Sequence, residues 1–210
     1  MTLRLRAGYV GRAAIEVRHS RFLAVVERTG DEAAARAVVA AARRAHPDAR
    51  HHCSAFVLAG DGAQPYERSS DDGEPSGTAG TPMLDALRAA QLVDVTAVVT
   101  RWFGGVKLGT GGLARAYGRV VAEALTGAPR VRRLTHQAFT LAAGHADAGR
   151  WHAELSAFGA DVEATYEADG VLLRVVHADS LALAGHVAAV TQGAGVLVPV
   201  GSVRVELPVP

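Results

Sequence analysis

The chain has 210 residues, of which 49% are hydrophobic and 20% are charged, an ordinary globular composition. This length accommodates one large domain or two small ones. No apolar run reaches 18 residues, so the sequence predicts no membrane-spanning helix. Residues 1–10 carry two arginines without an apolar stretch behind them, so we expect no signal peptide and a cytoplasmic location. The single cysteine, Cys53, excludes an internal disulfide and a multi-cysteine zinc site.

Charge is distributed unevenly along the chain, although the net charge is only +1. Residues 1–133 hold 19 Lys and Arg against 13 Asp and Glu, whereas residues 134–210 hold 3 against 8. A basic first half permits an anionic partner, and two solvated surfaces without a partner are the alternative. The only lysine, Lys107, lies in a glycine-rich segment. Its ammonium is a compact charge and makes contacts different from those of the planar guanidinium of arginine.

The first half predicts alternating strands and helices. Apolar residues alternate on both sides of His19-Ser20, which indicates a β-hairpin. Asp31 is placed to cap a helix that runs to about Ala45. The remaining expected elements are a strand over 53–58, a long loop over 60–80, a helix over 81–90 capped by Thr81, a buried strand over 95–100, a glycine-rich loop over 104–112 and a helix over 113–124.

The second half follows a β-α-β-β-α-β pattern. Gly127-Ala128-Pro129 ends the preceding helix, and we place a domain boundary after Arg133, giving domains 1–133 and 134–210. The expected strands cover 134–142, 160–167, 171–177 and 196–207, with one helix carrying Trp151 and Leu155 and another carrying Leu183 and Val187. This order in about 75 residues is the ferredoxin-like plan. The fold class is therefore α+β.

The loop over 69–82 contains three carboxylates within four positions, Asp71, Asp72 and Glu74. Carboxylate oxygens are ligands for hard cations, so these three are weak metal candidates, although the spacing of a calcium loop is missing. The alternative is structural: Asp and Ser side chains in turns accept hydrogen bonds from their own backbone.

The segment over 100–113 places a glycine-rich turn between a strand and a helix, an arrangement that suits anions because backbone N–H groups and the helix dipole converge there. It lacks the lysine of a phosphate-binding Walker loop and the acidic residue of a dinucleotide fold. Its charged and aromatic side chains suit a nucleic acid. The alternative is that Trp102 and Phe103 are core residues and that the glycines only allow close packing.

His51, His52 and Cys53 alternate on a strand, so at most two of them share a face, too few for zinc. No carboxylate partner for a Cys–His pair is evident. We therefore interpret Cys53 as a small core residue.

Four segments together resemble the YigZ/IMPACT family. They are Ser20-Arg21-Phe22, residues 51–56, residues 70–82 and residues 101–117, and they place the resemblance over about 15–125. Trp102 stands where the family more often has tyrosine. The resemblance implies a first domain similar to domain 2 of ribosomal protein S5 and a ferredoxin-like second domain, both like domains of the translocating elongation factor. It also implies a link to translation, with binding of nucleic acid or ribosomes suggested for bacterial members.

Our first hypothesis is a translation-associated regulator that binds RNA or the ribosome without a cofactor and without an indicated reaction. Its candidate phosphate- and nucleic-acid-binding residues lie in and after the glycine-rich loop: Arg101, Trp102, Gly104, Gly105, Lys107, Gly109, Gly111, Gly112, Arg115 and Arg119.

Two alternatives remain open. One is a metal-dependent enzyme acting on a phosphorylated or nucleotide substrate, which requires the acidic loop and the glycine-rich loop to converge on one cleft. The other is a protein-interaction adaptor without catalysis, whose acidic C-terminal domain would contact a protein partner.

Overall fold

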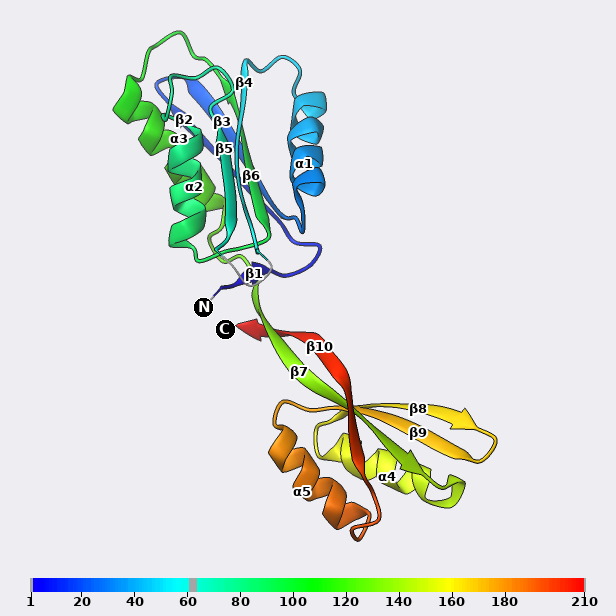
Figure 1. The fold of residues 1–210 in the computed structure, drawn as a ribbon. Coiled ribbons are helices and arrows are strands. Elements are labelled where there is room, and N and C mark those ends of the chain that lie inside the picture. Colours follow the sequence, from blue (N-terminus) through cyan, green and yellow to red (C-terminus); the bar gives the residue numbers. More distant parts are fainter. Residues whose placement is uncertain (1, 61–63, 210) are drawn as a thin grey trace. The chain divides into compact units, whose positions relative to one another are not determined.

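The structure, a computed structural model, describes residues 2–60 and 64–209. The chain forms two compact units, the first running to Arg132 and the second spanning Arg133–Leu207 (Figure 1). Both units are mixed α+β and contain antiparallel sheets, and the described residues form five helices in total. No helix among these residues is both long enough and apolar enough to cross a membrane.

The first unit is built on a sheet with the strand order β2-β3-β6-β4-β5, in which all neighbours are antiparallel. The strands are β2 (Val10–Val17), β3 (Ser20–Arg28), β6 (Val95–Trp102), β4 (His51–Leu58) and β5 (Tyr66–Ser70). Helices α2 (Gly80–Ala89) and α3 (Thr110–Ala124) cover one face and α1 (Glu32–Ala45) covers the other, as Figure 1 shows.

Strand alternation explains why helices cover both faces. In β4, Cys53, Ala55 and Val57 belong to the main core under α2 and α3, whereas Phe56 and Leu58 pack with Ala35 of α1. The central strand β6 is buried along almost its whole length, as expected of a strand covered on both faces. In the main core, the rings of Phe22 and Tyr117 meet edge to face with centroids 5.2 Å apart.

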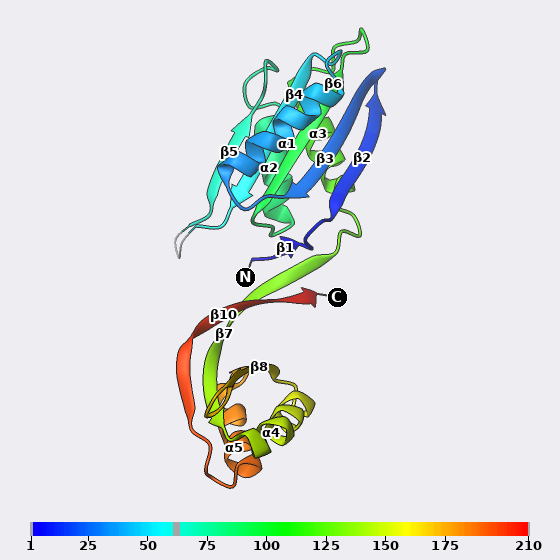
Figure 2. The same ribbon diagram turned by 90° about the vertical axis from the view of Figure 1, so that its right-hand side faces the viewer.

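The second unit contains most of β7 (Arg130–Ala143), α4 (His145–Ala157), β8 (Asp161–Glu167), β9 (Gly170–Val176), α5 (Ser180–Val190) and most of β10 (Leu197–Val209). Strand β7 pairs with β9, and β9 pairs with β8. Strand β10 also pairs with β7, beside which it runs in Figure 2. The short strand β1 (Arg4–Leu5) pairs with Arg130 and Val131, the part of β7 that belongs to the first unit. The core of the second unit lies between α4, α5 and the sheet and includes Trp151, Leu155, Leu173 and Leu183.

Most expected elements of the first unit are confirmed. Asp31 caps α1 by accepting a hydrogen bond from the Ala34 N–H at 2.7 Å. The expected hairpin is β2–β3, which turns at Arg18 and His19. Helix α2 begins at Gly80 and its N-cap is Ala79, so the expectation of a Thr81 cap is wrong.

The expectation of a continuous loop over 60–80 is also wrong. Tyr66–Ser70 forms β5, an edge strand that pairs with β4. Residues 61–63 of the expected loop lie outside the described residues. The strand escaped sequence analysis because nearly all of it is exposed, so it lacks an apolar alternation.

Candidate functional site

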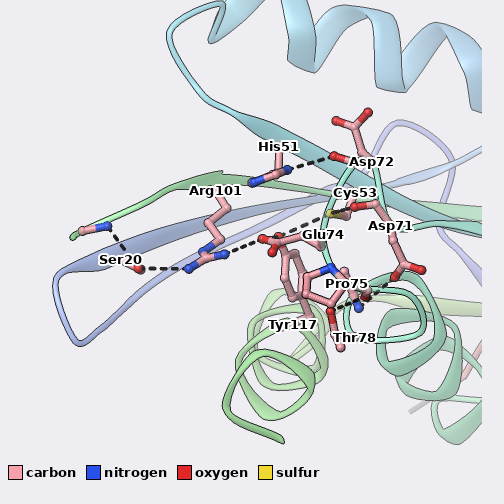
Figure 3. Close-up of polar contacts among 12 residues, drawn as sticks. Ser20, His51, Cys53, Asp71, Asp72, Glu74, Pro75, Thr78, Arg101 and Tyr117 are labelled. Atoms are coloured by element: carbon pink, nitrogen blue, oxygen red, sulfur yellow. Dashed lines mark hydrogen bonds and ion pairs between the residues drawn. The ribbon is translucent and has the colours of Figure 1, made fainter. Parts of the chain in front are cut away.

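A buried ion pair joins the acidic loop to the end of β6, the strand that leads into the glycine-rich loop (Figure 3). The Arg101 guanidinium donates a hydrogen bond to Glu74 Oε1 at 2.6 Å, and the side chains of both residues are less than a tenth exposed. The Tyr117 hydroxyl donates to the same oxygen at 2.8 Å. Strand β6, helix α3 and the acidic loop are thereby joined at one carboxylate, which satisfies charges that would be costly to bury alone.

The network continues on both sides of this pair. On one side, Cys53 Sγ lies 3.3 Å from the Tyr117 hydroxyl and 3.0 Å from the carbonyl oxygen of Asp71, and its one proton can serve only one of them at a time. On the other side, Ser20 Oγ accepts hydrogen bonds from Arg101 and from the Gly104 N–H, at 3.3 and 3.2 Å. Burial is the main cause that raises the pKa of the Cys53 thiol to about 12, and the nearby Glu74 carboxylate adds to the increase.

Asp71 organises the acidic loop from within. Its carboxylate accepts hydrogen bonds from the backbone N–H groups of Gly77, Ala79 and Gly80, each between 2.8 and 2.9 Å. Burial acts to raise the pKa of Asp71, but these three N–H groups outweigh it and hold the pKa below the ordinary value. Asp71 therefore caps the start of α2 across the loop, which is the structural alternative considered for this segment.

Asp72 joins the loop to β4 and α1. Its Oδ2 accepts the His52 N–H at 2.6 Å, and its Oδ1 pairs with Arg43. Burial opposes ionisation of Asp72, but these donors lower its pKa below the ordinary value. The Asp72 carbonyl oxygen lies 2.8 Å from His51 Nδ1. Because a carbonyl oxygen only accepts hydrogen bonds, Nδ1 of His51 carries a proton, and Nε2 is the acceptor whenever the ring is neutral.

The glycine-rich loop packs closely on the β2–β3 turn. A Cβ at Gly104 would lie 2.0 Å from the carbonyl carbon of His19, so only glycine fits there. Gly105 and Gly109 have φ values of 86° and 74°, in the left-handed region that favours glycine. Gly111 lies inside the first turn of α3, where an added Cβ meets only Arg115 Nη1, at 3.4 Å.

A cavity of about 410 Å³ lies between the two loops. Its polar lining comes from six residues: Arg50, His51, Glu74, Arg101, Lys107 and Thr110. Its apolar lining comes from Pro75, Phe103, Leu108 and Leu113. We call it the loop cavity. The acidic and the glycine-rich loops thus converge on one cleft, through Glu74 and Lys107.

A second cavity of about 340 Å³ shares Leu108 with the loop cavity. Arg18, Arg115 and Arg119 line it together with Val17, Gly112 and Ala116, and no carboxylate is among these lining residues. We call it the arginine cavity. Arg119 also pairs with Glu123 one helical turn away, at 2.7 Å and exposed to solvent.

The ten predicted phosphate-binding residues are therefore divided by the structure. Lys107 and Gly109 border the loop cavity, whereas Gly112, Arg115 and Arg119 border the arginine cavity. Arg101 also reaches the loop cavity, but its charge is paired with Glu74. The Trp102 indole N–H donates to Asp48 at 2.7 Å, and the Arg21 guanidinium lies over its ring. Phosphate binding by this set stays a prediction.

The three weak metal candidates do not share a site. The Asp71 and Asp72 carboxylates accept N–H groups and the Arg43 guanidinium, and neither lines the loop cavity. Glu74 faces Arg101 and Tyr117. Throughout the described ranges, no three His, Cys, Asp or Glu side chains gather as ligands for a metal ion.

Two cations of these cavities were not singled out from the sequence. Arg18 lines the arginine cavity and Arg50 lines the loop cavity. Each lies within two residues of a motif that the resemblance uses, Arg18 two residues before Ser20 and Arg50 one residue before His51. That adjacency is the signal that would have found them.

Comparisons with known proteins agree with this arrangement of motifs. The Impact N-terminal domain family matches residues 18–125, which contain both loops and the buried network. The IMPACT family member YigZ of Escherichia coli is 47% identical over 122 residues, 58% of this chain and 57% of that protein. An IMPACT family member of Thermus thermophilus is 41% identical over 155 residues, 74% of this chain and 82% of that protein.

One solved structure, described as that of a hypothetical protein, matches with a TM-score of 0.61 and 36% identity, covering 95% of this chain and 98% of its own. The matched part spans little more than half the length of several curated relatives, YigZ among them. The family match covers the residues that build the buried network and both loops. On this evidence, the chain belongs to the IMPACT family.

Proposed function

We propose that this protein binds RNA, in association with translation, through the surface formed by the glycine-rich loop and the start of α3. The observation that carries the proposal is the lining of the two cavities that meet at Leu108. Among the residues that the structure describes, six cations line them, namely Arg18, Arg50, Arg101, Lys107, Arg115 and Arg119, against the single carboxylate of Glu74. Phosphate groups are the ligand class that such a surface attracts most strongly.

The loop also carries an exposed aromatic ring beside these cations. Phe103 is 44% exposed. Alternation of charge with an accessible ring favours single-stranded nucleic acid, because every base offers a face for stacking. The buried network beneath the loop holds it against β3 and β6, so the surface is formed before a ligand arrives.

The link to translation comes from the family resemblance, which also implies the finer class of the first unit. We propose that the first unit is S5 domain 2-like and that the second is ferredoxin-like. Support for the latter is the β-α-β-β-α-β order of the second unit and its strand neighbours β10, β7, β9 and β8. A role on the ribosome also implies a cytoplasmic protein.

The proposal is tested by co-sedimentation of the full chain with ribosomes over a salt series, together with the binding of a labelled RNA. We expect affinity to fall steeply with salt. Replacing one phosphate-contacting cation, in Lys107→Ala or Arg115→Ala, weakens binding to all sequences alike and reduces the salt slope by about 1. Arg44→Ala is the matched control, because Arg44 lies on α1, on the opposite face of the sheet. Equal binding by all three variants contradicts the proposal.

The protein-interaction adaptor is the second candidate, and one observation favours it. Val198 and Val200 alternate at the start of β10 and share a face, Val196 directly precedes the strand, and all three are at least half exposed. Exposed apolar residues gathered on a strand often mark a protein contact. Sedimentation velocity of the wild type and of Val198→Asp tests this candidate: a larger species that the substitution removes supports self-association through β10.

A further inference from the structure

The loop cavity combines a cationic end with an apolar wall, which is the division expected for a ligand with an anionic group and a flat ring. Its volume, about 410 Å³, lies near the lower end of the range of roughly 300–1,000 Å³ for small-molecule sites. It therefore suits one ligand of modest size. An RNA duplex keeps its bases stacked inside the helix and cannot place one in such a cavity.

The cationic end has charge that the protein itself leaves unneutralised. Glu74, the one carboxylate that the described part of the chain contributes to the lining, already accepts hydrogen bonds from Arg101 and Tyr117. No side-chain partner of the Lys107 ammonium or the Arg50 guanidinium is found within residues 2–60 and 64–209. Arg101, 5% exposed, has a buried Nε without a hydrogen-bond partner among the described residues. An anion entering the cavity would meet this excess of positive charge.

The start of α3 adds to the attraction at the same end. Gly109, the N-cap of this 15-residue helix, and Thr110, its first residue, both line the cavity. A glycine cap has no side chain to accept hydrogen bonds from the first N–H groups of the helix. Those groups and the helix dipole favour an anion.

The apolar wall offers a ring to stack on. Phe103 lines the cavity and is 44% exposed, while the Arg101 guanidinium carbon lies 5.6 Å from its ring centroid. Leu113 and Pro75 complete the wall. His51, which also lines the cavity, has its Nδ1 proton directed to the Asp72 carbonyl oxygen, so in the neutral ring Nε2 accepts from a hydroxyl or amino group.

We infer that the loop cavity is a binding site for a single nucleotide unit. Its phosphate lies between Lys107, Arg50 and the start of α3, and its base packs against Phe103. The inference deepens the proposed function and rests on it for one source of the ligand, an unpaired nucleotide of a bound RNA. A free mononucleotide has the same chemistry and is the other source.

The test is isothermal titration of the full chain with adenosine 5′-monophosphate, adenosine and inorganic phosphate as separate probes. We expect the monophosphate to bind, and adenosine and phosphate each to bind at least roughly tenfold more weakly, because each lacks one of the two recognised groups. Phe103→Ala and Lys107→Gln each reduce monophosphate affinity by roughly tenfold. Val106→Ala is the matched control, since Val106 is an equally exposed apolar residue of the same loop that lines neither cavity. Phe103 and Val106 are both partly exposed, so thermal melting is expected to show intact folds.

Each remaining outcome bears on one proposal or the other. No monophosphate binding, equal binding of phosphate alone, or equal losses in Phe103→Ala and Val106→Ala overturns the nucleotide site. If RNA still binds in that case, the proposed function stands without it. RNA binding that prefers single strands over duplex, and loses this preference in Phe103→Ala, identifies RNA as the source. Monophosphate binding without any RNA binding supports the site, identifies a free nucleotide and refutes the proposed function.

Discussion

Removing the carboxylate of Glu74 is the sharpest test of the buried network. In Glu74→Ala, the Arg101 guanidinium, with a side chain 6% exposed, loses its ion partner, and the Tyr117 hydroxyl loses its acceptor. Breaking a buried pair from one side costs about 3–5 kcal/mol, because the remaining charge is buried without compensation. With a urea dependence of roughly 1–3 kcal/mol per molar for a small domain, the unfolding midpoint of the first unit should fall by about 2 M.

The assay uses the two tryptophans, one in each unit. In a Trp151→Phe background, the fluorescence of Trp102 reports on the first unit alone. The double variant with Glu74→Leu and Arg101→Met removes both charges. Its loss of unfolding free energy should therefore be smaller than the sum of the losses in the two single variants. A loss below about 1 kcal/mol in Glu74→Ala, or strict additivity in the double variant, would refute the reasoning that this pair stabilises the loops.

Three further predictions concern packing, pH and thiol reactivity. Gly104→Ala should destabilise the first unit by about 1–3 kcal/mol in urea unfolding, because the new Cβ would lie 2.0 Å from a backbone atom. The control is Gly185→Ala in α5, where the space around the new Cβ is open. It should leave the free energy of unfolding unchanged or raise it by up to about 1 kcal/mol. Burial first, then Arg43, lowers the pKa of His52, and the pKa of Asp72 is lowered by hydrogen bonds that outweigh burial, so both shifts make the fold less stable in acid than at neutral pH. The His52 contribution should therefore be lost as pH falls below about 6.5, and the Asp72 contribution below about 4, when urea midpoints are measured from pH 7.5 to 3; a flat profile between pH 7.5 and 5 contradicts the first step. Cys53, fully buried with its pKa raised to about 12, should resist iodoacetamide at pH 8 until urea unfolds the first unit, as mass spectrometry would show; rapid native labelling would contradict its placement.

Local signals explain what sequence analysis could predict. The Asp31 cap and the alternation around the β2–β3 turn act over a few residues, and the corresponding elements form where expected. The edge strand β5 was missed because a strand exposed on nearly every residue carries no apolar period. Strand β1 was missed because two residues are too few for any period.

The site was less accessible to sequence reasoning, since its key contacts join distant residues. From the sequence, Arg101 is a cation available to phosphate. In the structure it pairs with Glu74, 27 positions away, and no helical or strand period predicts a contact at that separation. From the sequence, a metal ligand and a turn residue are equally good interpretations of Asp71. The three backbone N–H groups that donate to its carboxylate in the structure favour the turn residue. The convergence of both loops on one cavity likewise depends on the order of strands in the sheet.

That strand order also has a consequence for how the first unit is made. Two hairpins, β2–β3 and β4–β5, join neighbours in sequence, but β6 lies between them and is the strand that connects one to the other. During synthesis, both hairpins leave the ribosome before Val95–Trp102 does, so each exposes an unpaired apolar edge in the meantime. Folding of the sheet must wait for the last strand inserted at its centre, and the nascent chain is most prone to mispairing just before that strand emerges.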